Sequence, residues 1–327
     1  MTQSLIRYCW TLAACILLAA CEKVVIDEEE TGSKETSGNV TLSVKGFEEL
    51  NGKARATMNL TEVCTRLSFV VYQNEEKVKA VNQKAGDADF GTVSLTLEQG
   101  DYQVLVLGHS CPGKDNPTMK EATKIQFTNL TESGNGTGYS DTFYYYGDLT
   151  VGAKQTNKSY KLKRAVALFR LVTTDVKPTN IKRIWFRYKG GSGALDATTG
   201  YGCVNSTQVV FFYPDETSDG KTMEFDLYTF LHEEESTIDI TVRGFDATTG
   251  GNVVFEQAFK GVEMQRNTIT QYSGALFGTG NEEPGGPDNP NDPNTPDDPN
   301  DPGDQGDEGE NTFVVETGWE GTRYVNF

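Results

Sequence analysis

The sequence predicts an all-β protein that holds two β-sandwiches in tandem. Apolar and polar residues alternate in many short runs between Val40 and Val242, which is the period of half-buried strands. Turn signals such as Gly190-Gly191 and Asp219-Gly220 separate these runs, and no long stretch has a helical period. Many short strands with frequent turns are typical of β-sandwiches.

The first 20 residues predict a lipoprotein signal peptide. One positive charge at Arg7 precedes the apolar run Trp10 to Ala20, and small residues lead to Cys21. The run has 11 residues, fewer than the ~20 that cross a bilayer as a helix. The cysteine resembles the lipobox of bacterial lipoproteins, which implies an acylated Cys21 and anchoring to the outer membrane. The alternative is an ordinary signal peptide with a chance cysteine.

Residues 21–37 follow as an acidic tether. Asp27 to Glu30 is a run of four acids, followed by Thr, Gly, Ser and Lys, a composition that cannot bury a core. An acidic run at this place also resembles the surface-export signal of Bacteroidetes lipoproteins. A plain solvated spacer is the equally good alternative.

The first sandwich is expected over residues 38–163. Its clearest strands are Val40 to Val44, Leu67 to Tyr72, Phe143 to Tyr146 and Tyr160 to Leu162. Two alternating runs, 93–97 and 102–106, flank the turn signal Gly100-Asp101 and predict a hairpin.

The second sandwich is expected over residues 164–280. Its alternating positions are Val166, Leu168, Ile184, Phe186, Val210, Phe212, Phe225, Leu227, Ile238, Ile240 and Val242.

The composition then changes abruptly. Residues 281–311 carry seven of the chain's 11 prolines, at every third position from Pro284 to Pro302, with Asp, Asn and Gly between them. A period of three matches the polyproline II helix, and repeated carboxylates repel one another, so an extended, stiff spacer is expected. Residues 312–327 then predict a terminal strand.

The net charge of −18 is unevenly distributed. Residues 22–37 carry −4 and residues 281–311 carry −11, so the part expected to fold is close to neutral. No basic stripe is present, which argues against nucleic acid as a partner.

Cysteines and histidines give no site for chemistry. After processing, Cys64, Cys111 and Cys203 remain beside the lipid-bearing Cys21. A Cys64–Cys111 disulfide is one possibility and three buried free thiols are another, because connectivity cannot be inferred from sequence. The two histidines, His109 and His232, stand in no catalytic or zinc-binding pattern. We therefore expect no enzyme activity, no metal and no cofactor.

Three segments together resemble the fimbrillin families of Bacteroidetes, which include stalk pilins and fimbrial anchor proteins. They are Phe143-Tyr-Tyr-Tyr-Gly-Asp-Leu-Thr150 with Tyr160 to Leu168, then Val262 to Phe277, and the terminal Val314-Val-Glu-Thr-Gly-Trp319. The resemblance implies transthyretin-like sandwiches that assemble by strand donation between subunits. The proline-rich spacer before the last strand departs from the family pattern.

The resemblance also implies a function and its residues. The chain would be a lipid-anchored fimbrial subunit or anchor, a component of cell-surface adhesion, with other fimbrial subunits as partners. Arg55 would be the site of proteolytic trimming in a polymerising subunit; the alternative, which the residues themselves favour, is an ordinary turn with basic side chains. Residues 40–50 would be the strand displaced or retained. The donor strand would include Phe313, Val315 and Trp319, unless this strand completes its own domain. The alternative function is a glycan-binding surface lipoprotein, with a host or bacterial surface ligand.

Overall fold

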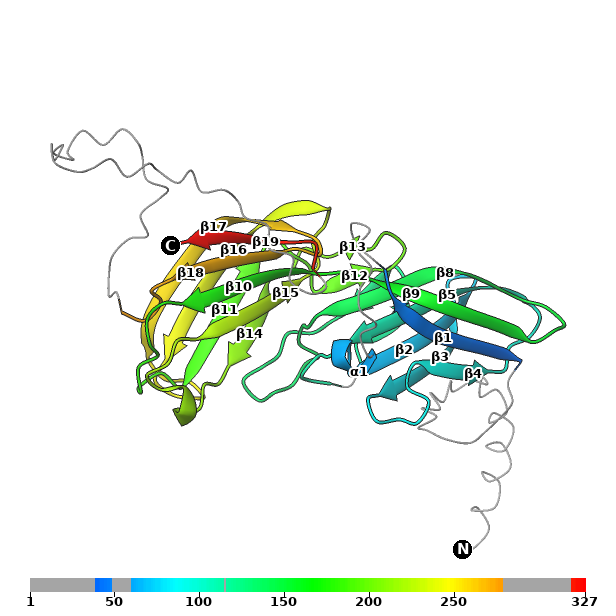
Figure 1. The fold of residues 1–327 in the computed structure, drawn as a ribbon, viewed down its shortest axis with the longest axis horizontal. Coiled ribbons are helices and arrows are strands. Elements are labelled where there is room, and N and C mark those ends of the chain that lie inside the picture. Colours follow the sequence, from blue (N-terminus) through cyan, green and yellow to red (C-terminus); the bar gives the residue numbers. More distant parts are fainter. Residues whose placement is uncertain (1–38, 49–59, 115, 279–318) are drawn as a thin grey trace, which may run out of the picture. The chain divides into compact units, whose positions relative to one another are not determined.

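The computed structural model describes residues 39–48, 60–114, 116–278 and 319–327, which belong to one compact unit (Figure 1). Nearly all regular structure in these ranges is β, which confirms the predicted fold class. The only helices among the described residues are the single turn α1 (Leu60–Val63) and the 3-10 turn η1 (Glu216–Ser218).

The first half of the chain forms a seven-stranded sheet, ordered β3-β2-β5-β8-β9-β1-β4. Its strands are β1 (Val40–Phe47), β2 (Arg66–Gln73), β3 (Glu76–Lys84), β4 (Thr92–Leu95), β5 (Gly100–His109), β8 (Thr142–Val151) and β9 (Thr156–Arg164). One core cluster takes inward residues from both ends of this order, for example Phe69 of β2 and Leu42 of β1. The sheet therefore folds over its own core as a sandwich does.

The predicted hairpin around Gly100-Asp101 is wrong. The strand β4 pairs with β1, whereas β5 pairs with β2 and β8, and Gly100 already lies within β5. Alternation correctly located both strands. It could not identify their partners, because strand partners are set by contacts far apart in sequence.

Two four-stranded sheets form the second half of the chain. One is ordered β15-β10-β18-β19, with β10 (Ala167–Thr173), β15 (Glu224–Thr229), β18 (Ile269–Gly274) and β19 (Thr322–Asn326). The other is ordered β14-β11-β16-β17, with β11 (Arg183–Lys189), β14 (Gln208–Phe212), β16 (Glu235–Phe245) and β17 (Val253–Gln265). The core between them includes Phe169, Phe186, Phe225, Ile240 and Phe259.

A fourth, small sheet takes strands from both halves of the chain. Its order is β13-β12-β7-β6, with β6 (Thr118–Glu121), β7 (Lys124–Gln126), β12 (Ala194–Asp196) and β13 (Tyr201–Gly202). Leu195 of β12 lies opposite Ile125 of β7. Both are fully buried in a third core cluster, which also holds Leu105 of β5 and Phe230. The two halves therefore share a sheet and a core.

Candidate functional site

The first strand, β1, lies between two strands from distant parts of the sequence, and we call this position the seat of β1. It pairs in parallel with β9 and antiparallel with the short strand β4, so β1 joins these two elements (Figure 1). Val40 and Leu42 are fully buried there. Each such side chain contributes roughly 1.5–3 kcal/mol of burial free energy. Removing β1 would leave an apolar groove and unpaired backbone groups on two strands.

Asn39 fixes the start of this strand. Its side-chain nitrogen donates to the Leu97 carbonyl at 2.7 Å, and its side-chain oxygen accepts from the Leu97 N–H at 2.9 Å. Its backbone carbonyl accepts from Thr156 N at 3.0 Å. Asn39 could not be predicted as a functional residue, because an asparagine before a strand carries no signal of its long-range partner.

The terminal strand, β19, pairs with a strand of the chain's own second half, and we call this position the seat of β19. In Figure 1, β19 runs along β18, and the two pair in parallel from Ile269↔Thr322 to Ser273↔Asn326. The Phe327 ring packs edge-on against Phe259, with centroids 4.9 Å apart. A donated terminal strand would have to leave this seat.

Trp319, one of the predicted donor residues, packs on a buried arginine. The Arg164 guanidinium lies 3.9 Å from the Trp319 ring centroid and 4.8 Å from that of Phe143. Its Nε and Nη2 donate to the two Asp141 carboxylate oxygens at 2.8 and 2.9 Å, and Nη1 donates to Asn267 Oδ1 at 2.7 Å. The side chain of Arg164 is 4% exposed, so its charge is removed from water and is compensated by the ion pair with Asp141. Arg164 was another residue that sequence reasoning did not single out.

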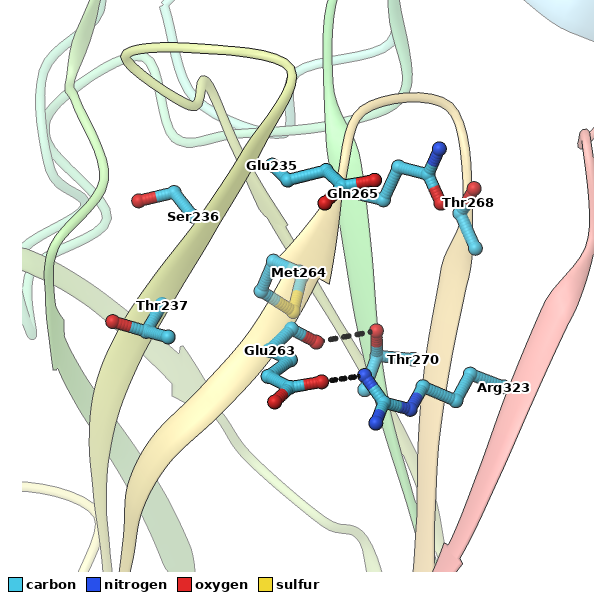
Figure 2. A pocket seen from close by; sticks show the side chains of 9 residues that line it. All are labelled: Glu235, Ser236, Thr237, Glu263, Met264, Gln265, Thr268, Thr270 and Arg323. Atoms are coloured by element: carbon cyan, nitrogen blue, oxygen red, sulfur yellow. Dashed lines mark hydrogen bonds and ion pairs between the residues drawn. The ribbon is translucent and has the colours of Figure 1, made fainter. Parts of the chain in front are cut away.

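A pocket of about 400 Å³ lies beside β19 (Figure 2). The Arg323 side chain reaches Glu263 across it, and Thr270 Oγ1 donates to the Glu263 carbonyl at 2.9 Å. Its lining is hydroxyl, amide, carboxylate and guanidinium, with Met264 as the apolar member. Sugar-binding sites usually add an aromatic ring for stacking, and none lines this pocket among the described residues.

A family profile described as "Family of unknown function (DUF6562)" matches residues 30–296. The chain belongs to this family. The match extends through β18 into the proline-rich segment and ends before Trp319 and β19. No curated protein matches this DUF6562 chain.

Several solved structures resemble the DUF6562 chain at low identity. The fimbrial anchor protein Mfa2 from Porphyromonas gingivalis is 10% identical, with a TM-score of 0.40 over 68% of this chain and 83% of that one. A Bacteroides ovatus protein described as a "putative adhesin" is 13% identical, with a TM-score of 0.41 over 65% and 88%. A fimbrial assembly protein from Parabacteroides distasonis is 11% identical, with a TM-score of 0.33 over 74% and 91%.

Of the two possibilities for Cys64 and Cys111 of the DUF6562 chain, a disulfide and free thiols, the structure has free thiols. Both are free thiols, and they are buried in different core clusters. Burial raises the pKa of Cys64 to about 12 and that of Cys111 to about 11, so both stay protonated and unreactive. The third thiol, Cys203, is exposed rather than buried.

Other predicted features of the DUF6562 chain lie outside the described residues, namely Cys21, Arg55, Phe313 and Val315. Within the described ranges no group of His, Cys, Asp and Glu side chains could hold a metal ion. No helix in those ranges is long and apolar enough to span a membrane. His109 is buried and His232 bonds the Gly202 carbonyl through Nδ1, and neither meets a nucleophile in a pocket.

Proposed function

We propose that this protein is a lipid-anchored component of a cell-surface fimbrium, either a subunit or its anchor, and that it assembles by strand donation. The seat of β1 is the observation that carries the proposal. An amino-terminal strand that joins β9 to β4 closes an apolar core, and the segment that follows it contains Arg55. In a chain cut at Arg55, β1 would no longer be covalently joined to the rest of the fold. If β1 then left the sheet, the emptied groove would take an extended strand.

The terminal segment 312–327 of a neighbouring subunit is the proposed donor. Its alternating Phe313 and Val315 offer side chains to a groove of period two. The spacer 281–311 gives the donor its reach, because polyproline II advances about 3.1 Å per residue. A subunit that donates this segment gives up its own contacts at Trp319 and β19 and gains those of the neighbour's groove.

Mass spectrometry of the protein from native cells distinguishes the two forms. A new amino terminus at Ala56 is expected for a polymerising subunit, and an intact acylated Cys21 for an anchor. Either form should co-purify with fimbriae. Recovery only as a separate membrane protein, absent from fimbrial preparations, would refute the fimbrial function.

The anchoring half of the proposal has its own test. Cys21→Ser should block processing or release the protein from the membrane fraction, because acyl chains on Cys21 are its proposed tether. Cys203→Ser, a change at an exposed thiol, is the matched control and should stay membrane-bound. A processed Cys21→Ser protein that remains in the membrane would show that the anchor lies elsewhere.

A further inference from the structure

The outward face of the sheet β14-β11-β16-β17 carries a row of rings and cations. Inward residues such as Ile184, Phe186 and Val242 fill the core, so the alternate residues on the same strands face outward. We call this surface the aromatic face, defined by Trp185, Arg187, Val209, Phe211, Tyr213 and Arg243.

Contacts across the strands hold these side chains in place. Trp185 lies opposite both Phe211 and Arg243, and the Arg243 guanidinium is 5.2 Å from the Trp185 ring centroid. Phe211 and Tyr213 stack with centroids 6.4 Å apart and planes at 22°. Tyr213 is 45% exposed. The rings are therefore pre-ordered and partly open to solvent, which lowers the entropy cost of binding.

One cation on this face has no partner among the described residues. Arg187 is exposed and lies opposite the uncharged Val209 and Thr241, whereas Arg243 is paired with Glu256. Lys189, exposed on the same strand as Arg187, lies opposite Asp239 of β16. The aromatic face thus combines aromatic rings with positive charge available to a ligand.

We propose that the aromatic face binds the acidic, proline-rich segment 281–311 of the same chain. Proline-rich segments in polyproline II form dock onto aromatic-lined surfaces, and carboxylates pair with guanidinium groups. This segment has a proline at every third position from 284 to 302 and a net charge of −11. Both halves of the recognition chemistry are therefore present within one chain.

The point where the chain leaves the described fold supports binding within the molecule. Gly278 follows Phe277, whose ring packs edge-on against Phe255 of β17, with centroids 5.5 Å apart. Phe277 follows β18 of the other sheet, and the Phe255 contact brings the chain to the core side of the edge strand β17. To reach the outward face the segment must pass around β17; from Gly278 to Pro302 a polyproline II chain reaches about 75 Å, and a four-stranded face is about 15 Å wide. The prolines can therefore reach every strand of the face, and docking would shorten the reach left to the terminal strand.

Zero-length carbodiimide crosslinking of carboxylates to lysines, followed by mass spectrometry, tests this in the full mature chain. Crosslinks from aspartates in 288–307 should concentrate at Lys189 and Lys260, which flank the face, over the exposed Lys158 and Lys161 of β9. They should fall at about 1 M sodium chloride, where the screening length is about 3 Å. A spacer that samples solvent freely would give crosslinks spread over all these lysines at any salt concentration, and that result would overturn the proposal.

Matched variants separate docking from general charge effects. Tyr213→Ser and Arg187→Glu should each lower the Lys189 and Lys260 crosslinks about fivefold, from the loss of one exposed ring or ionic contact. Tyr324→Ser, at a tyrosine of similar exposure on β19, and Lys161→Glu should leave them unchanged. In an equal mixture of nitrogen-15-labelled and unlabelled protein, crosslinks should join like-labelled chains. Mixed-label crosslinks at the same lysines would assign the face to a second copy's segment and refute binding within one chain.

Discussion

Single side chains in the first half show how burial fixes a protonation state. His109 is fully buried, and its Nδ1 accepts from the Cys111 N–H at 3.3 Å, so Nε2 carries the proton of the neutral ring. Nε2 has no hydrogen-bond partner among the described residues. Burial first, and the nearby Arg66 charge second, lower the pKa of His109 from 6.5 to about 4. A second proton would place an unpaired cation in the core.

This lowered pKa predicts a loss of stability in mild acid. The unfolded chain binds a proton at His109 below pH 6.5, and the folded chain does so only near pH 4. Stability should therefore be full above pH 6.5 and fall as the pH drops towards 4, by up to about 3 kcal/mol. Urea unfolding across this range measures the effect. His109→Gln should flatten this part of the profile and His232→Gln should keep it, whereas an unchanged slope in His109→Gln would assign the acid sensitivity to other groups.

The first and last strands of the fold, β1 and β19, are held in similar ways. Both β1 and β19 add a parallel pairing to a strand from a distant part of the sequence, β9 and β18 respectively. Each can be removed without cutting the chain between other strands. Terminal strands of this kind are the ones that strand exchange can use, because the rest of the ladder stays connected.

Deleting residues 319–327 should destabilise the isolated protein. The change removes the pairing along β18, the Trp319 ring over Arg164 and the Phe327 contact with Phe259. A loss of about 3 to 5 kcal/mol is expected from stripping an edge strand and part of a core. Chemical unfolding of the truncated and full chains measures it. Deleting residues 285–302 of the spacer alone is the control, and should change stability by less than the strand deletion does.

Equal stability of the 319–327 deletion and the full chain would mean that the terminal strand does not hold its own seat in solution. That result would favour the predicted role of this segment as a donor. Partner capture by each truncated protein would then show whether donation needs the strand, the spacer or both.

The whole molecule is joined by the sheet that both halves build. Gln126 ends β7 and Gly193 directly precedes β12; they lie 67 residues apart along the chain, yet the Gln126 side chain donates to the Gly193 carbonyl at 3.3 Å. Leu195 and Phe230 from the second half share a core with Leu105 from the first. We therefore expect the halves to unfold together rather than as independent domains.

Leu195→Ala tests this coupling. The side chain is fully buried, so its truncation should cost about 2 to 5 kcal/mol. Calorimetry should show a single transition in the parent and in the variant, shifted to a lower temperature. Phe169→Leu, within the core of the second half alone, is the comparison. Two separated transitions, with Leu195→Ala moving only one, would show that the shared sheet does not couple the halves.

The all-β class, most strand positions and the two acidic segments, tether and spacer, could be predicted from the amino-acid sequence alone. Alternation at Leu42 or Ile240 reports locally which face of a strand is buried, so these positions could be assigned without a structure. Charged strands such as β3 were missed, because its burial pattern is mostly exposed and carries little alternation.

Strand partners and long-range side-chain contacts could not be predicted from the sequence and became known from the folded structure. The expected hairpin between 93–97 and 102–106 is replaced by pairing of β4 with β1, and the two cysteines of the possible disulfide lie in separate cores. Three other features also arise from residues far apart in sequence: the stacking of Trp319 on Arg164, the hydrogen bonds between Asn39 and Leu97, and the sheet shared by β7 and β12. Local periodicity fixes the face of a strand, but the choice of its partner is set by the packing of the complete core.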